Sequence, residues 1–299
     1  MTTIHLPLFL PPLLVLATTL AAGAAAQNPT PVPAPATADK QGQAATTGKL
    51  AEWPALKDTD KDRARALAGQ FKKPDAKLYP EAKRGLLQLG AGAAPILIQQ
   101  VSDRVDSINA SLFGVLDEML DRSHAALMAR EAKRPVVELR RYLVHRLCRF
   151  GDAEMAPLFE ATRKDKDEQT AFYCELGLLA QKRADALTPV LVYCKAHWSE
   201  IAGLVAEVLP AARCPGSGTL VFEAIAKANA ADQMNGLRLL RYLMAKEQGM
   251  LLRRYLEAND HPVKREAVNA ARVLHGEPPI DNLSVFQAIE HAKTWLQKL

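Results

Sequence analysis

The feature that most constrains the fold of this 299-residue chain is a recurrence of about 31 residues. Six segments of helical character each follow a polar or glycine-containing turn. Their starts, separated by 62, 32, 30, 31 and 34 residues, are Pro95, Pro157, Pro189, Thr219, Met250 and Ser284. The first interval is close to two periods, which predicts a further unit between Asp106 and Arg134. One helix pair of this length cannot bury both apolar faces alone, so we expect stacked pairs that share a continuous core.

The stretch Val136–Phe150 shows the local pattern behind this recurrence. Apolar side chains return at spacings of three and four residues, and charged side chains fill the other face. Pro135 stands at the start, where its missing N–H costs nothing, and Gly151 follows the end as a C-cap glycine. No alternating run with a hairpin turn occurs in the sequence. We therefore predict an all-α fold over residues 51–299, an α-solenoid or α-α superhelix of six to seven stacked antiparallel helix pairs.

The last predicted helix, Val285–Leu296, is expected to close the array. It should bury one side through Phe286, Ile289 and Trp295. A terminal unit of this kind keeps the end of a repeat array soluble.

Two segments resemble a known repeat. Asp260–Ala267, continuing to Leu274 and Gly276, is similar to the HEAT repeat and its short, PBS-lyase-type form. Leu86–Leu97 resembles the joint between the two helices of that repeat, although Lys264 stands where the family usually has arginine. The resemblance implies an armadillo-like helical scaffold for protein–protein interaction. A minority of such arrays have lyase or DNA-repair roles, and no catalytic motif of those members is matched here.

The N-terminal segments carry targeting information. Residues 1–26 contain an uncharged apolar stretch that runs into Ala24–Ala26, which is typical of a signal peptide. Residues 27–50, with alternating prolines and many alanines, are predicted to be a disordered linker. We therefore expect an exported protein, periplasmic or secreted, without a transmembrane span in its mature chain. Retention of the segment as an uncleaved anchor is the alternative.

Charge supplies the only candidate binding residues. The 38 Lys and Arg exceed the 33 Asp and Glu, a net charge of +5 that permits an acidic partner without requiring one. Arg163, Lys195 and Lys227 are each 32 residues apart, late in three successive second helices. On a solenoid these side chains would form an exposed basic ladder along the concave face. The alternative is that each simply complements the dipole at a helix C-terminus.

Catalytic, metal-binding and cofactor motifs are not found. The sequence contains no HExxH, CxxC, GxxxxGK[ST] or GxSxG pattern. Cys194 and His197 have a helical spacing that suits half of a metal site, but a structural zinc normally needs four ligands. The remaining histidines are expected on helix surfaces. We assign no catalytic residue, no metal and no cofactor.

The four cysteines raise the question of a disulfide, because exported proteins meet oxidising conditions. Cys174 and Cys194 lie on two helices of one predicted hairpin, at similar heights above its turn. A disulfide between them is one hypothesis, and two buried free thiols are the other.

Three function classes remain open from the sequence. The favoured one is a non-enzymatic scaffold that binds a protein or peptide along its concave face. The second is a binder of an anionic polymer, either cell-envelope material or nucleic acid, through the basic ladder. The third is an enzyme whose site is assembled from scattered residues.

The signal-peptide hypothesis has a direct test. Expression of the full chain in a secreting host should yield a protein that begins at Gln27, because the cleavage site follows Ala26. Intact-mass spectrometry of the exported fraction measures this start. A mature chain that retains residues 1–26 would instead identify the segment as an anchor.

Overall fold

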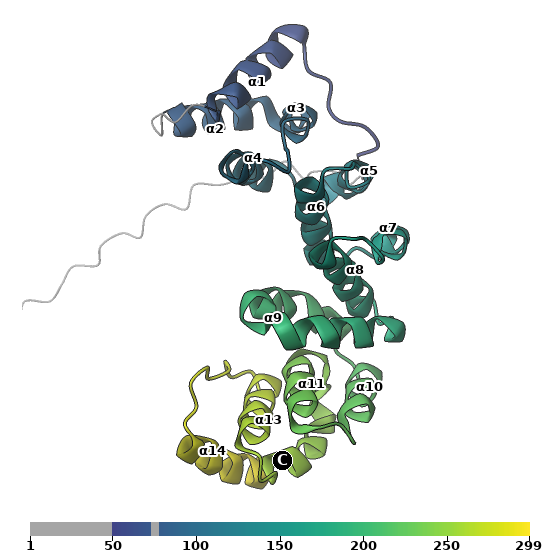
Figure 1. Cartoon of the computed structure of the whole chain (residues 1–299), viewed down its shortest axis with the longest axis vertical. Coiled ribbons are helices and arrows are strands. Elements are labelled where there is room, and N and C mark those ends of the chain that lie inside the picture. The colour runs from purple at the N-terminus through teal and green to yellow at the C-terminus, as the bar shows by residue number, and fades with distance from the viewer. Residues whose placement is uncertain (1–49, 73–77) are drawn as a thin grey trace, which may run out of the picture. The chain divides into compact units, whose positions relative to one another are not determined.

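The computed structural model describes residues 50–72 and 78–299, and within these ranges all regular structure is helical (Figure 1). The predicted signal peptide and all but the last residue of the predicted linker lie outside the described residues. The helices are α1 (Asp58–Gln70), α2 (Leu78–Leu89), α3 (Ala94–Ile98), α4 (Asp106–Met119), α5 (Ala125–Glu131), α6 (Val137–Phe150), α7 (Ala156–Thr162), α8 (Glu168–Ala180), α9 (Leu187–Val208), α10 (Pro215–Ile225), α11 (Ala230–Leu243), α12 (Arg253–Leu256), α13 (His261–Leu274) and α14 (Val285–Lys298).

In most units a long first helix is followed by a shorter second helix, whereas α13 and α14 have 14 residues each. The pairs are α2 with α3, α4 with α5, α6 with α7, α11 with α12, and α13 with α14. Helix α9 bends at His197, whose φ of −120° and ψ of 19° are not helical. Its first part therefore ends the pair begun by α8, and its second part begins the pair completed by α10. The predicted all-helical array of consecutive pairs is confirmed, including the extra unit between Asp106 and Arg134.

Each first helix contacts the next one along the chain. Contacts join α2 to α4, α6 to α8, and α11 to α13, while the buried apolar side chains form one continuous cluster. Figure 1 shows α5, α7 and α10 on the same side of the first helices α4, α6 and α11. The second helices α5, α7 and α10 therefore present a common face, which we call the second-helix face.

Local sequence explains how these helices begin and end. Gly151 ends α6 in the left-handed conformation, with φ of 62°, as predicted. Asp167 and Asp260 accept a hydrogen bond from a backbone N–H in the first turn of α8 and α13, respectively. Prolines stand in the first turns of α3, α7, α10 and α13, where no hydrogen bond is lost.

Residues 50–57 form no helix, and α1 starts at Asp58. One prediction about the C-terminal end of the array needs correction. Helix α14 buries Ala288, Ala292 and Trp295, whereas Phe286 is 72% exposed and Ile289 is half-buried. The buried positions follow a spacing of four and three residues, which places Phe286 on the opposite face.

Arginines connect consecutive pairs through helix ends. Arg146 donates to the Leu120 carbonyl at 2.6 Å, and Arg254 donates to the Ala226 carbonyl at 2.8 Å. Arg213 donates to the carbonyls of Arg241 and Tyr242 at 3.1 and 3.2 Å. These carbonyls end helices and have no partner within their own helix, so a cation from the neighbouring pair satisfies them.

A second set of arginines reaches carboxylates one unit further along. Arg140 forms two hydrogen bonds with Asp165, at 2.9 and 3.0 Å, and Glu266 of α13 accepts from Arg238 and Arg241 of α11. Glu266 is only 4% exposed and Arg241 only 5%. Both arginines also lie over the ring of Trp198, within 5.7 Å of its centroid. At the junction between α11 and α13, two arginines therefore share the buried carboxylate of Glu266, while the buried Nε of Arg241 has no hydrogen-bond partner in the described ranges.

None of the helices that the structure describes combines the length and apolar character needed to cross a membrane.

The Glu266 cluster yields a stability prediction. Glu266→Gln leaves Arg241 buried without its countercharge, which should lower the free energy of unfolding by about 3–5 kcal/mol. The matched control is Glu290→Gln, because Glu290 pairs with Lys293 at 2.8 Å on the surface of α14 and is 50% exposed. That change should cost about 1 kcal/mol or less. Urea titration followed by circular dichroism measures both, and equal losses would contradict the assignment.

Candidate functional site

The predicted basic ladder is not formed as expected. Arg163, at the end of α7, binds both oxygens of Glu175 at 2.8 Å and reaches Asp185 at 2.6 Å. Its side chain is only 17% exposed. The hydrogen bonds that Arg163 donates to Glu175 and Asp185 raise the pKa of its guanidinium further above its usual range. Arg163 therefore joins neighbouring helices and is not an exposed binding residue.

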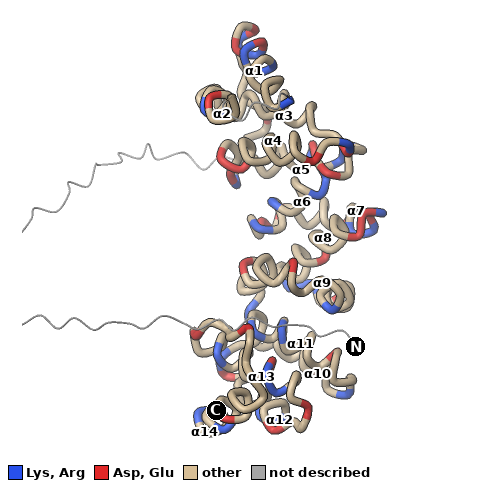
Figure 2. Tube along the Cα trace, turned by 60° about the vertical axis from the view of Figure 1, so that its left-hand side comes forward, with Lys and Arg blue, Asp and Glu red and all other residues tan. Residues whose placement is uncertain are grey.

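The other two ladder residues lie at the surface. Lys195 of α9 is 51% exposed and pairs with Asp232 of α11 at 2.6 Å. Lys227 follows α10, is exposed, and forms no ion pair within the part of the chain that the structure describes. Figure 2 shows acidic and basic residues intermixed along the helices instead of a continuous basic stripe. The predicted ladder thus has one half-buried member bound to carboxylates, one neutralised member and one unpaired member.

The arginines of α6 are also paired. Arg140 and Arg141 bind Asp165 and Asp167, and the side chain of Arg140 is 16% exposed. The hydrogen bonds from Arg141 and Thr170 lower the pKa of Asp167 to about 2, against the effect of burial. These charges hold α6 to α8.

A different set of lysines occupies equivalent positions on the second-helix face. Lys133, Lys164 and Lys195 are 31 residues apart, and all three are exposed. Lys133 and Lys164 have no ion-pair partner among residues 50–72 and 78–299. The sequence prediction chose Arg163 in place of its neighbour Lys164. Both residues lie in the turn after α7, where Arg163 reaches Glu175 and Asp185 and Lys164 points to the surface.

Lys133 and Lys164 mark the end of a groove between α5 and α7. The groove has a volume of about 560 Å³ and continues into a second hollow of about 320 Å³ that contains both lysines. Ala126, Ala129, Met155, Pro157, Leu158 and Ala161 supply its apolar lining, and Arg130, Glu154 and Thr162 its polar lining. The surface therefore combines an apolar floor with two unneutralised cations at one end.

A related groove lies two units further along the chain. Thr188, Leu191, Val192 and Lys195 line it on α9, each 62 residues after its counterpart Ala126, Ala129, Arg130 and Lys133 on the α5 side. Its volume is about 450 Å³, and α10 and α11 complete it. Here Asp232 neutralises the lysine. Asn235 also lines this groove, and its buried Oδ1 has no hydrogen-bond partner within the described ranges.

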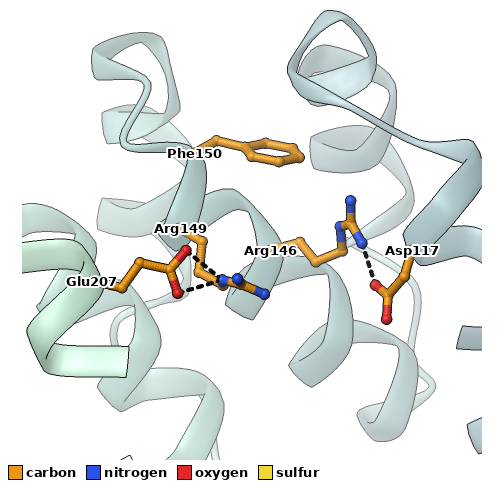
Figure 3. Close-up of a pocket in the computed structure, with 5 residues that line it drawn as sticks. All are labelled: Asp117, Arg146, Arg149, Phe150 and Glu207. Carbon is orange, nitrogen blue, oxygen red and sulfur yellow. Dashed lines mark hydrogen bonds and ion pairs between the residues drawn. The ribbon is translucent and has the colours of Figure 1, made fainter. Parts of the chain in front are cut away.

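A third cavity, of about 360 Å³, lies between α4, α6 and α9 (Figure 3). Arg149 places its Nε 2.9 Å from both carboxylate oxygens of Glu207, and Arg146 pairs with Asp117. The neighbouring His145 has a pKa below its usual value because burial and Arg149 disfavour its charged form. Each guanidinium here has its own carboxylate, so the cavity offers neither a free base nor a free cation.

The cysteines are four free thiols, so the structure does not contain the hypothesised bridge between Cys174 and Cys194. Burial raises the pKa of both, that of Cys194 to about 12. Cys174 instead lies near Cys148, whose pKa is raised by burial and by the Cys174 thiol, since α6 and α8 are in contact. Cys214 differs from these three. It caps α10, and hydrogen bonds from Ser217 lower its pKa.

The described parts of the chain contain no arrangement of side chains that suits a metal ion. No group of three or more His, Cys, Asp or Glu side chains there is placed to hold an ion. The expectation of surface histidines fails for His124, which is 7% exposed and hydrogen-bonded to Asp121 at 2.9 Å.

Comparisons with known proteins give a limited result. No protein-family model matches the chain, and no curated protein matches it. Among solved structures, human deoxyhypusine hydroxylase in complex with glycerol matches with 14% identity over 81% of this chain and 98% of that chain. The TM-score is 0.31, so this likeness carries no argument about what the present chain does. The HEAT resemblance consequently rests on the two sequence segments that show it and on the paired-helix architecture.

The cysteine environments predict selective alkylation. Iodoacetamide should label Cys214 in the folded protein at neutral pH at least about 100-fold faster than the other three thiols, because thiolates react and buried thiols do not. Ser217→Ala should slow this labelling, since it removes the side-chain hydrogen bond that lowers the Cys214 pKa. Peptide mass spectrometry locates the label. After denaturation without reductant all four cysteines should be labelled, and protection of Cys174 and Cys194 would reveal a bridge.

Proposed function

We propose that this chain is an exported, non-enzymatic helical-repeat scaffold that binds a segment of another protein in the groove between α5 and α7. One observation carries the proposal: an apolar groove ends at two exposed lysines, Lys133 and Lys164, that no carboxylate in the described ranges neutralises. Most arginines near the helix junctions are, in contrast, already paired within the chain. Two unpaired lysines beside an apolar floor are suited to a partner segment that carries both apolar side chains and carboxylates.

The dimensions of the groove support this proposal. A volume of about 560 Å³ lies within the usual range of ~300–1,000 Å³ for binding pockets. Its floor combines small residues, Ala126, Ala129 and Ala161, with the larger Met155 and Leu158. Apolar side chains of a partner would remove this surface from water, and charge complementarity at the lysine end would fix their direction.

The pairing of charges weighs against the anionic-polymer alternative. A phosphate-rich polymer requires many unneutralised cations in a row. Arg163 and Lys195, two of the three residues on which that alternative depended, have carboxylate partners. Export is part of the proposal on the strength of the N-terminal sequence alone.

A peptide-display selection on the full chain tests the proposed site. We expect enrichment of segments in which apolar residues adjoin Asp or Glu. The double variant Lys133→Glu with Lys164→Glu should bind the selected peptides at least about tenfold more weakly, a loss of about 1.4 kcal/mol, because it replaces attraction by repulsion. Fluorescence anisotropy measures the affinities, which should also fall with added salt.

The matched control is Lys57→Glu with Lys72→Glu. Both lysines are exposed, neither lines a groove described above, and the change in net charge is the same. This control should keep the affinity of the original chain. Selected peptides without acidic residues, or equal affinities for the two double variants, would contradict the proposal.

A further inference from the structure

Residues 50–57 show how a segment without helical structure lies on helices of this array. The backbone N–H of Leu50 donates to the Ser123 carbonyl at 3.1 Å, and Arg130 donates to the Ala51 carbonyl at 2.7 Å. The indole ring of Trp53 stacks on the buried His124 ring, with centroids 6.2 Å apart. We call residues 50–57 the N-terminal strap.

The strap has a three-residue period. Leu50, Trp53 and Leu56 are half-buried, and the five other residues of the strap are exposed. Its last residue, Lys57, has φ of −62° and ψ of 154°. The three-residue period of burial and the backbone angles of Lys57 are typical of the polyproline II conformation, whereas Ala51 and Glu52 form a bend.

Close backbone approach accompanies this docking. A Cβ atom on Gly92 would lie 2.6 Å from the Pro54 carbonyl oxygen, which is closer than real contacts allow. Glycine at position 92 therefore lets the strap pass directly over the turn between α2 and α3. The strap is thus held by a backbone hydrogen bond, a hydrogen bond from Arg130, a ring stack and a close backbone approach at Gly92.

Arg130 connects the strap to the groove between α5 and α7. Its guanidinium binds the strap carbonyl of Ala51, and the same residue lines the groove. The groove offers the same kinds of feature: small residues for close approach, and exposed cations that can donate to carbonyls. A polyproline II segment has no internal hydrogen bonds, so its carbonyls are free to accept. In a helical peptide, most backbone carbonyls already accept hydrogen bonds within the helix and are not free.

We propose that the partner segment bound between α5 and α7 is an extended, polyproline II-type peptide with apolar side chains three residues apart and a carboxylate at one end. This inference rests on the proposed function and specifies the class of its ligand. The apolar side chains occupy the alanine-lined floor, the Arg130 guanidinium donates to a peptide carbonyl, and the carboxylate lies between Lys133 and Lys164.

Two fluorescein-labelled peptides of equal length and charge test this inference on the full chain. The first has leucine at every third position, prolines between the leucines, and aspartates at both ends. The second replaces the prolines with alanine, places the leucines three and four residues apart, and is stapled as a helix. Anisotropy titration should show the extended peptide binding at least about tenfold more tightly than the helical one.

A groove-filling variant locates the binding. Ala161 is exposed on α7 and lines both parts of the groove, so Ala161→Trp should weaken binding of the extended peptide at least about tenfold. Ala110→Trp is the control, because Ala110 is exposed on α4 and lines none of the grooves described above. Urea midpoints of the two variants should equal that of the original chain, which separates loss of binding from loss of folding.

The outcomes separate this inference from the proposed function. Equal or tighter binding of the helical peptide, blocked by Ala161→Trp, overturns the extended conformation and leaves the binding groove in place. If neither peptide binds with a Kd below about 1 mM, the inferred ligand class is overturned. The groove itself is tested separately, by the display selection and the lysine variants. Binding of the extended peptide that Ala161→Trp leaves unchanged overturns the site.

Discussion

Arginine side chains that cross from one helix pair to the next provide the directional interactions of this array. The last carbonyls of an α-helix have no partner within the helix, and a short repeat has a helix end in every unit. Arg146, Arg213 and Arg254 each donate to such carbonyls in a neighbouring pair. Apolar burial favours stacking without fixing its register, so these bonds specify how one pair meets the next.

The same use of arginine limits what the surface can bind. Arg140, Arg141 and Arg163 face carboxylates of adjacent elements and are no longer available to a partner. A positive net charge is consequently a poor guide to function here, because much of the basic content is structural. The lysines at 133 and 164 are exposed and have no ion pair in the described ranges, and they differ from the structural arginines by lying beside an apolar groove.

The second-helix face combines this charge distribution with a repeated geometry. The groove at α5 and the groove at α9 use lining positions that are 62 residues apart, which is two units of the array. Their chemistry differs, because Asp232 neutralises the lysine of the second groove. A repeated backbone can therefore offer distinct sites through single substitutions.

The sequence by itself determined the helical class, the period of about 31 residues and the boundaries of several helices. These properties follow from residue types and their spacing along the chain. Gly151, for example, ends α6 because glycine readily adopts the left-handed backbone conformation found there. Tertiary structure alone decided which charges remain free. Arg163 and Lys164 are adjacent in sequence, yet the first reaches Glu175 and the second is exposed. A partner contributed by another helix pair determines this difference, and the spacing of residues along one helix contains no information about that partner.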